Sequence, residues 1–136
     1  MNKVKILLSI IAVVFMISSC TKSGFPEINN LELGLENSKT AYLGKDFHIE
    51  AEVVAVNLIQ KIDIKIYDEK LDAGQTNPAW EYTNVIIYTD NLKNVLLHEH
   101  IDVPSNVATG EYHIHISVTD KEGNQTEKED HIDVVK

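Results

Sequence analysis

Apolar residues recur at every second position along most of the chain, and this period of two limits the fold more than any other feature. Residues i and i+2 of a β-strand share one face, so the alternation predicts strands with one apolar and one polar side. No helical repeat of useful length follows residue 20. The alternating or β-branched runs are Ile28–Leu33, Phe47–Val53, Ile62–Ile66, Val85–Tyr88, Leu97–Val103, Tyr112–Val118 and Ile132–Val134.

Seven such strands, each with one apolar face, are typical of two antiparallel sheets packed face to face. We therefore expect an all-β, immunoglobulin-like antiparallel β-sandwich over residues 27–136. The segment Asp120–Asn124 predicts a hairpin turn, with Gly123 supplying a positive φ. Tyr112 opens a strand where immunoglobulin-like domains carry a tyrosine corner. The segment Asp68–Pro78 lacks the alternation and predicts the longest loop.

The N-terminus indicates export. Lys3 and Lys5 precede an apolar run over Ile6–Ile17, which is shorter than the roughly 20 residues of a membrane-spanning helix. The run ends in Ile17-Ser18-Ser19-Cys20, which resembles the lipobox of bacterial lipoproteins and contains the only cysteine of the chain. The resemblance implies cleavage before Cys20, a diacylglyceryl group on its thiol and a further acyl chain such as palmitate on its amine. An ordinary signal peptide that happens to contain a cysteine is the alternative.

We expect a signal peptide over residues 1–19, a lipidated Cys20 with a tether over residues 20–26, and the sandwich domain after them. Two or three acyl chains hold a protein firmly on a bilayer. The residue after Cys20 is Thr21 and not the Asp associated with inner-membrane retention in enterobacteria, which favours an anchor in the outer membrane of a bacterial envelope. The membrane, through Cys20, is thus the first expected partner.

The charge of the chain argues against nucleic acid as a partner. The basic residues are 12 lysines and no arginine, against 21 acids, for a formal charge of -9. Removal of residues 1–19 takes away Lys3 and Lys5 but no acid, so the charge becomes -11. A nucleic-acid-binding module needs a basic face, and this composition does not supply one.

Four runs of sequence together resemble a known family. They are Gly44–Glu52, His98–Pro104, Gly110–His115 and Thr119–Asn124. They are similar to an uncharacterised family of Bacteroidota lipoproteins, a domain of unknown function with an immunoglobulin-like fold, over about residues 26–135. The resemblance implies the sandwich fold and the envelope location, and it brings no established activity.

Histidine is the residue type that suggests a chemistry. His98 and His100 share one strand face with Asp102, and His113 and His115 share another. In the immunoglobulin strand order, His48 opens a strand beside the end of the strand that holds His98, His100 and Asp102. The same order places His113 and His115 beside His131 and Asp133. We expect two groups of histidines, at one end of the sandwich and on opposite outer faces.

Two or three imidazoles with a carboxylate suit Zn²⁺ or Cu²⁺, whereas Ca²⁺ and Mg²⁺ prefer oxygen ligands. The expected ligands are His48, His98, His100, His113 and His115, and the spacing of a sandwich allows at most one group per ion. Three other interpretations stay open, namely solvated strand histidines, a hydrogen-bond ladder between strands and a pH-responsive contact. Asp120, Glu122 and Asn124 are a weaker candidate for Ca²⁺.

No catalytic motif is recognisable. The chain has no Gly-x-Ser-x-Gly elbow and no phosphate-binding or dinucleotide-binding glycine loop, and lipid would occupy its only thiol. We therefore expect a non-catalytic binding module. One alternative is an accessory protein whose sheet edges contact another envelope protein. Another is a glycan-binding module that uses Trp80, although a single Trp in a small sandwich more often packs in the core.

Overall fold

The computed structural model describes residues 24–136. The expected signal peptide, Cys20 and most of the expected tether lie outside the described residues. Eight strands and one short 3₁₀ helix, η1, make up the described part. They are β1 (Glu27–Leu33), η1 (Leu35–Asn37), β2 (Thr40–Tyr42), β3 (Asp46–Val54), β4 (Ile59–Leu71), β5 (Tyr82–Ile87), β6 (Asn94–Asp102), β7 (Gly110–Asp120) and β8 (Gln125–Val135).

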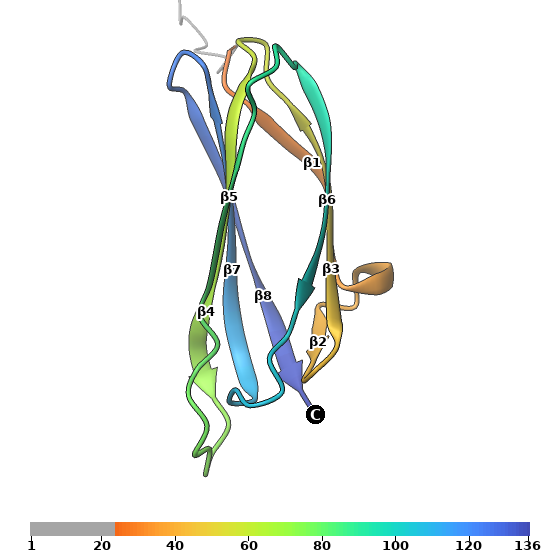
Figure 1. The fold of residues 1–136 in the computed structure, drawn as a ribbon, viewed down its shortest axis with the longest axis vertical. Helices are drawn as coiled ribbons and strands as arrows, with labels where there is room; N and C mark the ends of the chain where they lie inside the picture. The colour runs from red at the N-terminus through yellow and green to blue at the C-terminus, as the bar shows by residue number, and fades with distance from the viewer. Residues whose placement is uncertain (1–23) are drawn as a thin grey trace, which may run out of the picture.

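The strands form two packed sheets, so the predicted β-sandwich is confirmed (Figure 1). One sheet has the order β1-β3-β6, and the other has the order β2-β8-β7-β4-β5. β1, β3 and β6 share one sheet and β4, β7 and β8 share the other, as in the immunoglobulin strand order. β5 differs from that order, because it pairs with β4 in the larger sheet, whereas the fourth strand of a seven-stranded immunoglobulin domain belongs to the sheet that corresponds to β1-β3-β6. All pairings are antiparallel except that of β2 with the end of β8.

Two features of the sheets differ from the sequence prediction. The prediction had seven strands, and the additional one is β2, whose three residues are too few to show an alternation. The predicted loop over Asp68–Pro78 is also shorter, because β4 continues to Leu71. This extension includes an irregularity, since Asp68 pairs with Tyr112 and Lys70 pairs with Glu111, which leaves Glu69 as the extra residue of a β-bulge.

The core lies between the sheets and is built from the apolar side of each alternating strand. Ile62, Ile64 and Ile66 of β4 are each no more than 1% exposed, while the residues between them face outward. The expected tyrosine corner is present, because the Tyr112 hydroxyl donates to the Ala108 carbonyl at 2.7 Å. Burial raises the pKa of this hydroxyl, although the Trp80 N–H donates to it and acts in the opposite direction.

The hairpin between β7 and β8 forms as predicted, with Gly123 at φ 87°. At the other end of β7, Gly110 is required by close packing. A Cβ on Gly110 would come within 2.4 Å of the Lys70 carbonyl oxygen, and its φ is 144°. This close approach lets the end of β4 run beside β7, which brings the outward residues of both strands near one another.

Candidate metal centres

The first candidate site lies on the outer face of the three-stranded sheet. His48 of β3 is directly opposite His100 of β6, and Glu50 is opposite His98. The three imidazole rings form a nearly equilateral triangle, with centroids 5.0 Å apart for His48–His98, 5.2 Å for His48–His100 and 5.0 Å for His98–His100. The structure therefore brings together the three histidines that the strand order predicted to meet on this face.

The ring nitrogens of His98 and His100 are arranged as metal ligands are. Their Nε2 atoms face each other at 3.0 Å. His100 Nδ1 lies 2.5 Å from Asp46 Oδ2, and His98 Nδ1 lies 3.4 Å from Glu50 Oε2. A carboxylate on Nδ1 favours the tautomer with hydrogen at Nδ1, which leaves the Nε2 lone pair free for a metal ion.

His48 is the third and most buried histidine of the group. Its side chain is only 10% exposed, because the two other rings cover it, and its Nε2 lies 3.9 Å from Glu50 Oε2. Its Nδ1 is buried and has no hydrogen-bond partner within residues 24–136. A buried polar atom without a partner costs free energy, which a bound ion or an ordered water molecule can recover.

The spacing fits a tetrahedral ion. Two nitrogen ligands at 2.0–2.1 Å from zinc lie about 3.4 Å from each other, and the centroids of two such imidazoles lie about 5 Å apart. The observed separation of the His98 and His100 nitrogens is 3.0 Å, and one ligand atom from each of the three histidines falls within 4.8 Å of the others. Small side-chain adjustments would therefore suffice for all three to bind one ion.

The carboxylates beside these histidines differ from those predicted. Asp102 was expected beside His100, and it is opposite Asp46 in the strand register. The carboxylate that contacts His100 belongs to Asp46. Glu50, which contacts His48 and His98, was also not among the predicted site residues. Glu50 lies two residues after His48, so the period of two already placed it on the same face.

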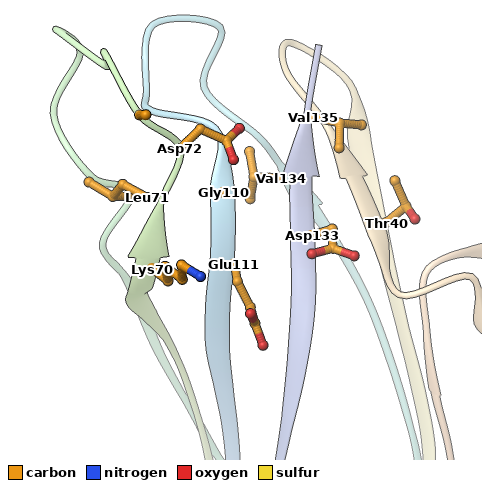
Figure 2. A pocket seen from close by; sticks show the side chains of 10 residues that line it. Thr40, Lys70, Leu71, Asp72, Gly110, Glu111, Asp133, Val134 and Val135 are labelled. Carbon is orange, nitrogen blue, oxygen red and sulfur yellow. The ribbon is translucent and has the colours of Figure 1, made fainter.

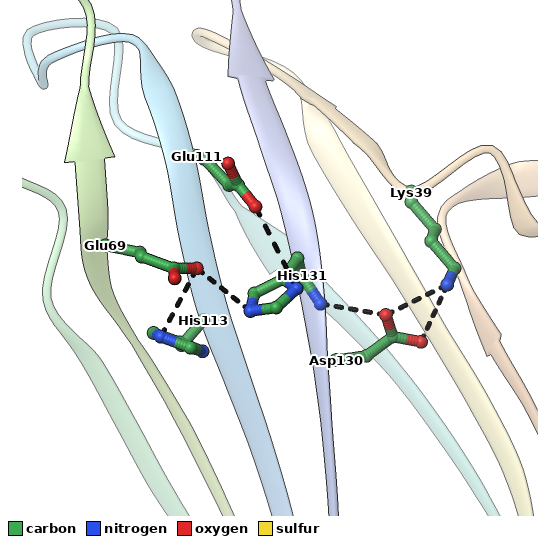
Figure 3. Close-up of polar contacts among 6 residues, drawn as sticks. All are labelled: Lys39, Glu69, Glu111, His113, Asp130 and His131. Carbon is green, nitrogen blue, oxygen red and sulfur yellow. Dashed lines mark hydrogen bonds and ion pairs between the residues drawn. The ribbon is translucent and has the colours of Figure 1, made fainter.

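The second group lies on the outer face of the five-stranded sheet, and it divides in a way that the sequence did not show. His113 of β7 is opposite His131 of β8, and Glu69 Oε2 lies 3.3 Å from His113 Nε2 and 2.9 Å from His131 Nε2 (Figure 3). His115, expected to pair with His113, has other partners. Its Nε2 is 2.6 Å from the Tyr67 hydroxyl, and its Nδ1 is 3.2 Å from Glu129 Oε1.

A partly buried carboxylate fixes the backbone beside this second group. Asp130 accepts a hydrogen bond from the His131 backbone N–H at 2.8 Å and pairs with Lys39 Nζ at 2.8 Å (Figure 3). Burial acts to raise the pKa of Asp130, but the hydrogen bonds from Lys39 and His131 outweigh it and hold this pKa below its ordinary value. Asp133, which was expected to join this group, lies opposite Glu111 and lines a neighbouring pocket.

That pocket has a volume of about 430 Å³ and lies where β4, β7 and β8 meet β2 (Figure 2). Lys70 is the basic residue of its lining, and Asp72, Glu111 and Asp133 are acidic. Glu111 belongs both to this lining and to the surroundings of His131, because its Oε1 lies 3.9 Å from His131 Nδ1. The pocket therefore adds negative charge beside the second group.

Neither Trp80, a candidate for binding a glycan, nor the turn at Asp120, a candidate for binding Ca²⁺, provides an open site. Trp80 is 3% exposed and packs against Tyr82 and Tyr112, so its ring offers no face on which a sugar could stack. Both oxygens of Asp120 accept hydrogen bonds within the hairpin, two of them from Asn124. Asn124 thus directs its amide nitrogen, and not its oxygen, to the place where a calcium ion would be bound.

Residues 24–136 contain no helix that is long and apolar enough to span a membrane.

Comparisons with known proteins support the fold and leave the chemistry open. The model of a family called Domain of unknown function (DUF4625) matches residues 18–135. No curated protein sequence matches. Several solved structures are similar to this chain, among them the following three.

The first is OgpA from Akkermansia muciniphila, with a TM-score of 0.53 and 12% identity over 79% of this chain and 28% of that one. The second is the sporulation control protein Spo0M from Bacillus subtilis, with a TM-score of 0.51 and 12% identity over 83% of this chain and 50% of that one. The third is the alkylpurine DNA glycosylase AlkC from Pseudomonas fluorescens, with a TM-score of 0.52 and 9% identity over 83% of this chain and 31% of that one. This chain spans half or less of each, and at these identities the likeness concerns the fold alone.

Proposed function

This chain belongs to the DUF4625 family of unknown function, and we propose that it is a lipid-anchored envelope protein whose sandwich binds a Zn²⁺ or Cu²⁺ ion through His48, His98 and His100. One observation carries the proposal. The Nε2 atoms of His98 and His100 converge to 3.0 Å while both Nδ1 atoms point to carboxylates. A hydrogen bond between the two Nε2 atoms needs a hydrogen on one of them, whereas a bound ion would receive the lone pairs of both.

The donor set also determines which ions fit. Neutral imidazole is a borderline ligand that suits Zn²⁺ and Cu²⁺, and it suits Mg²⁺ and Ca²⁺ poorly. Asp46 and Glu50 orient the rings and increase the basicity of their Nε2 atoms, as carboxylates behind metal-bound histidines do. The surplus of acids over lysines in the chain further favours the approach of cations.

We infer capture or sensing of the ion in place of catalysis. The side chains of His98 and His100 are 48% and 53% exposed on an outer sheet face. An ion bound there stays in contact with water and with other ligands. A catalytic metal centre works best in a dry, shaped cavity, and this face does not provide one around the three rings.

Calorimetric titration of the tag-free chain in mild detergent with Zn²⁺ and Cu²⁺ tests the proposal. We expect micromolar or tighter binding at pH 7.5 and its loss at pH 5.5, because protons compete for the imidazole nitrogens. His98→Ala/His100→Ala should weaken one binding event at least 100-fold. Glu52→Gln, an exposed acid on β3, should leave that event unchanged. Equal binding by the parent and the double-histidine variant would refute this ion site.

The anchor at Cys20 is a separate part of the proposal and has its own test. Its support is the apolar run and the sequence Ile17-Ser18-Ser19-Cys20. Cys20→Ala should abolish incorporation of labelled fatty acid into the protein in a bacterial host, because the thiol and amine of this residue would carry the acyl chains. Incorporation into Cys20→Ala at the level of the parent would exclude lipid attachment at this residue.

A role in protein–protein contact is the second candidate, and the exposed edge of the larger sheet favours it. β5 is the terminal strand of the order β2-β8-β7-β4-β5, and Val85 and Ile87 on it are 45% and 71% exposed. Apolar edge strands invite pairing with a strand of another chain. If Ile87→Lys abolishes co-purification of an envelope protein while metal binding is unchanged, this second function is supported.

A further inference from the structure

The group on the outer face of the five-stranded sheet contains a second set of ligands, which the first site does not use. Three adjacent strands supply it, with Glu69 on β4, His113 on β7 and His131 on β8 (Figure 3). We propose that Glu69, His113 and His131 form a second, independent site for a divalent transition-metal ion. The ligand atoms are the Nε2 atoms of the two histidines and Oε2 of the glutamate.

The distances among these atoms are those of ligands around one ion. Glu69 Oε2 lies 2.9 Å from His131 Nε2 and 3.3 Å from His113 Nε2, and the two rings have centroids 4.6 Å apart. Ligands at 2.0–2.2 Å from a tetrahedral ion lie about 3.4 Å apart, so a small outward movement of each side chain would admit the ion. One carboxylate and two imidazoles leave further coordination positions for water or an external ligand.

The backbone of β4 is modified at the place where this ligand set needs it. Glu69 is the extra residue of the bulge between Asp68 and Lys70, and it has no partner in the register with β7. Bulges change the direction of side chains and are common beside functional sites. Here the bulge accompanies a carboxylate that reaches over β7 to a histidine on β8, two strands away (Figure 3).

The groups around the ligands agree with this assignment. Glu111 Oε1 lies 3.9 Å from His131 Nδ1 and can orient that ring, while Asp130 and Lys39 fix the backbone of His131. The acidic pocket that Glu111 also lines would raise the local concentration of cations (Figure 2).

The neighbouring His115 belongs outside this ligand set. The Tyr67 hydroxyl and Glu129 contact its two ring nitrogens, and the Tyr67 ring packs against both His113 and His115 at 5.2 and 5.3 Å. The centroids of His113 and His115 are 6.1 Å apart, whereas those of His113 and His131 are 4.6 Å apart. His113 and His115, which the sequence placed in one group, therefore have different polar partners. His115 provides a matched control.

The test removes the first site and asks whether an ion remains. In the tag-free full chain carrying His98→Ala/His100→Ala, native mass spectrometry and Zn²⁺ calorimetry should detect one bound Zn²⁺ per chain. Adding Glu69→Gln or His131→Ala should weaken this binding more than 10-fold, whereas adding His115→Ala should change it less than 2-fold. Thermal unfolding of each variant checks that the sandwich has formed.

A second measurement needs no variant at this site. Zn²⁺ should shift the imidazole ¹⁵Nε2 signals of His113 and His131 in the unsubstituted chain and leave those of His115 in place. No Zn²⁺ on the His98→Ala/His100→Ala chain would overturn the second site, as would loss of binding on His115→Ala but not on Glu69→Gln. Because the first site is absent from that background, its own failure cannot produce either result.

Discussion

The carboxylate of Asp120 and the imidazoles of His98 and His100 are both convergent polar groups, but their lone pairs are used in opposite ways. Asp120 is fully buried, and its two oxygens accept hydrogen bonds from two backbone N–H groups and from the amides of Asn57 and Asn124. The Nε2 atoms of His98 and His100, in contrast, face each other on an exposed surface. Ligand-type residues form a candidate cation site only where their lone pairs are not already saturated by hydrogen bonds from other groups.

The largest expected effect tests the occupied side of this comparison. Asp120→Ala should lower the free energy of unfolding by about 3 kcal/mol, because it leaves buried N–H donors of the hairpin without an acceptor. Urea unfolding monitored by circular dichroism measures the change. Glu122→Ala is the matched control, since the Glu122 backbone N–H that donates to Asp120 is retained. If Asp120→Ala reduced Zn²⁺ binding while the fold stayed intact, the division between structural and ligand-binding groups would fail.

A smaller effect is expected from the carboxylate behind the first site. Asp46→Asn should weaken Zn²⁺ binding there about 10-fold, because Asp46 holds the Nδ1 hydrogen of His100. Asp102→Asn, at the opposite position of the register, should have no measurable effect on affinity. Glu111→Gln should affect the second site less than Asp46→Asn affects the first, since Glu111 is 3.9 Å from His131. Competition with a zinc-binding dye gives all three affinities.

The smallest expected effect concerns acid stability. Burial acts to raise the pKa of Asp120, but hydrogen bonds from Asn124, Asn57 and Glu122 outweigh it, so this pKa is below its ordinary value. A lowered pKa in the folded state contributes stability that is complete above the unfolded value of about 3.9 and is lost as pH falls through the folded pKa. Stability of the parent should therefore decline more steeply below pH 4 than that of Asp120→Asn, which cannot titrate there. Equal slopes in acid unfolding would show that Asp120 makes no such contribution.

Much of the fold was predictable because its signal is local. The alternation in Tyr112–Val118 depends only on the geometry of a strand, and it predicted correctly which residues face the core. The turn at Gly123 and the tyrosine corner at Tyr112 are similarly local. β2 was missed, because its three residues are held by parallel pairing with β8, which lies about 90 positions later in the chain.

The histidine groups were predictable in part for the same reason. Strand order placed His48 beside His100 and His113 beside His131, and the register agrees. The prediction that His113 and His115 belong to one site did not take account of side chains on other strands. Tyr67 and Glu129 engage His115, while Glu69 engages His113. No local pattern in β7 contains these partners.

The sequence by itself determined which side chains share a strand face, because a period of two follows from the covalent geometry of an extended chain. It thereby determined the sandwich and the outward direction of His98 and His100. Only the tertiary structure decided that Asp46 and not Asp102 contacts His100. The same holds for Glu69, which lies at a β-bulge and contacts two histidines. Those outcomes depend on register, bulge and rotamer between strands far apart in the chain, where many alternatives satisfy the same local alternation.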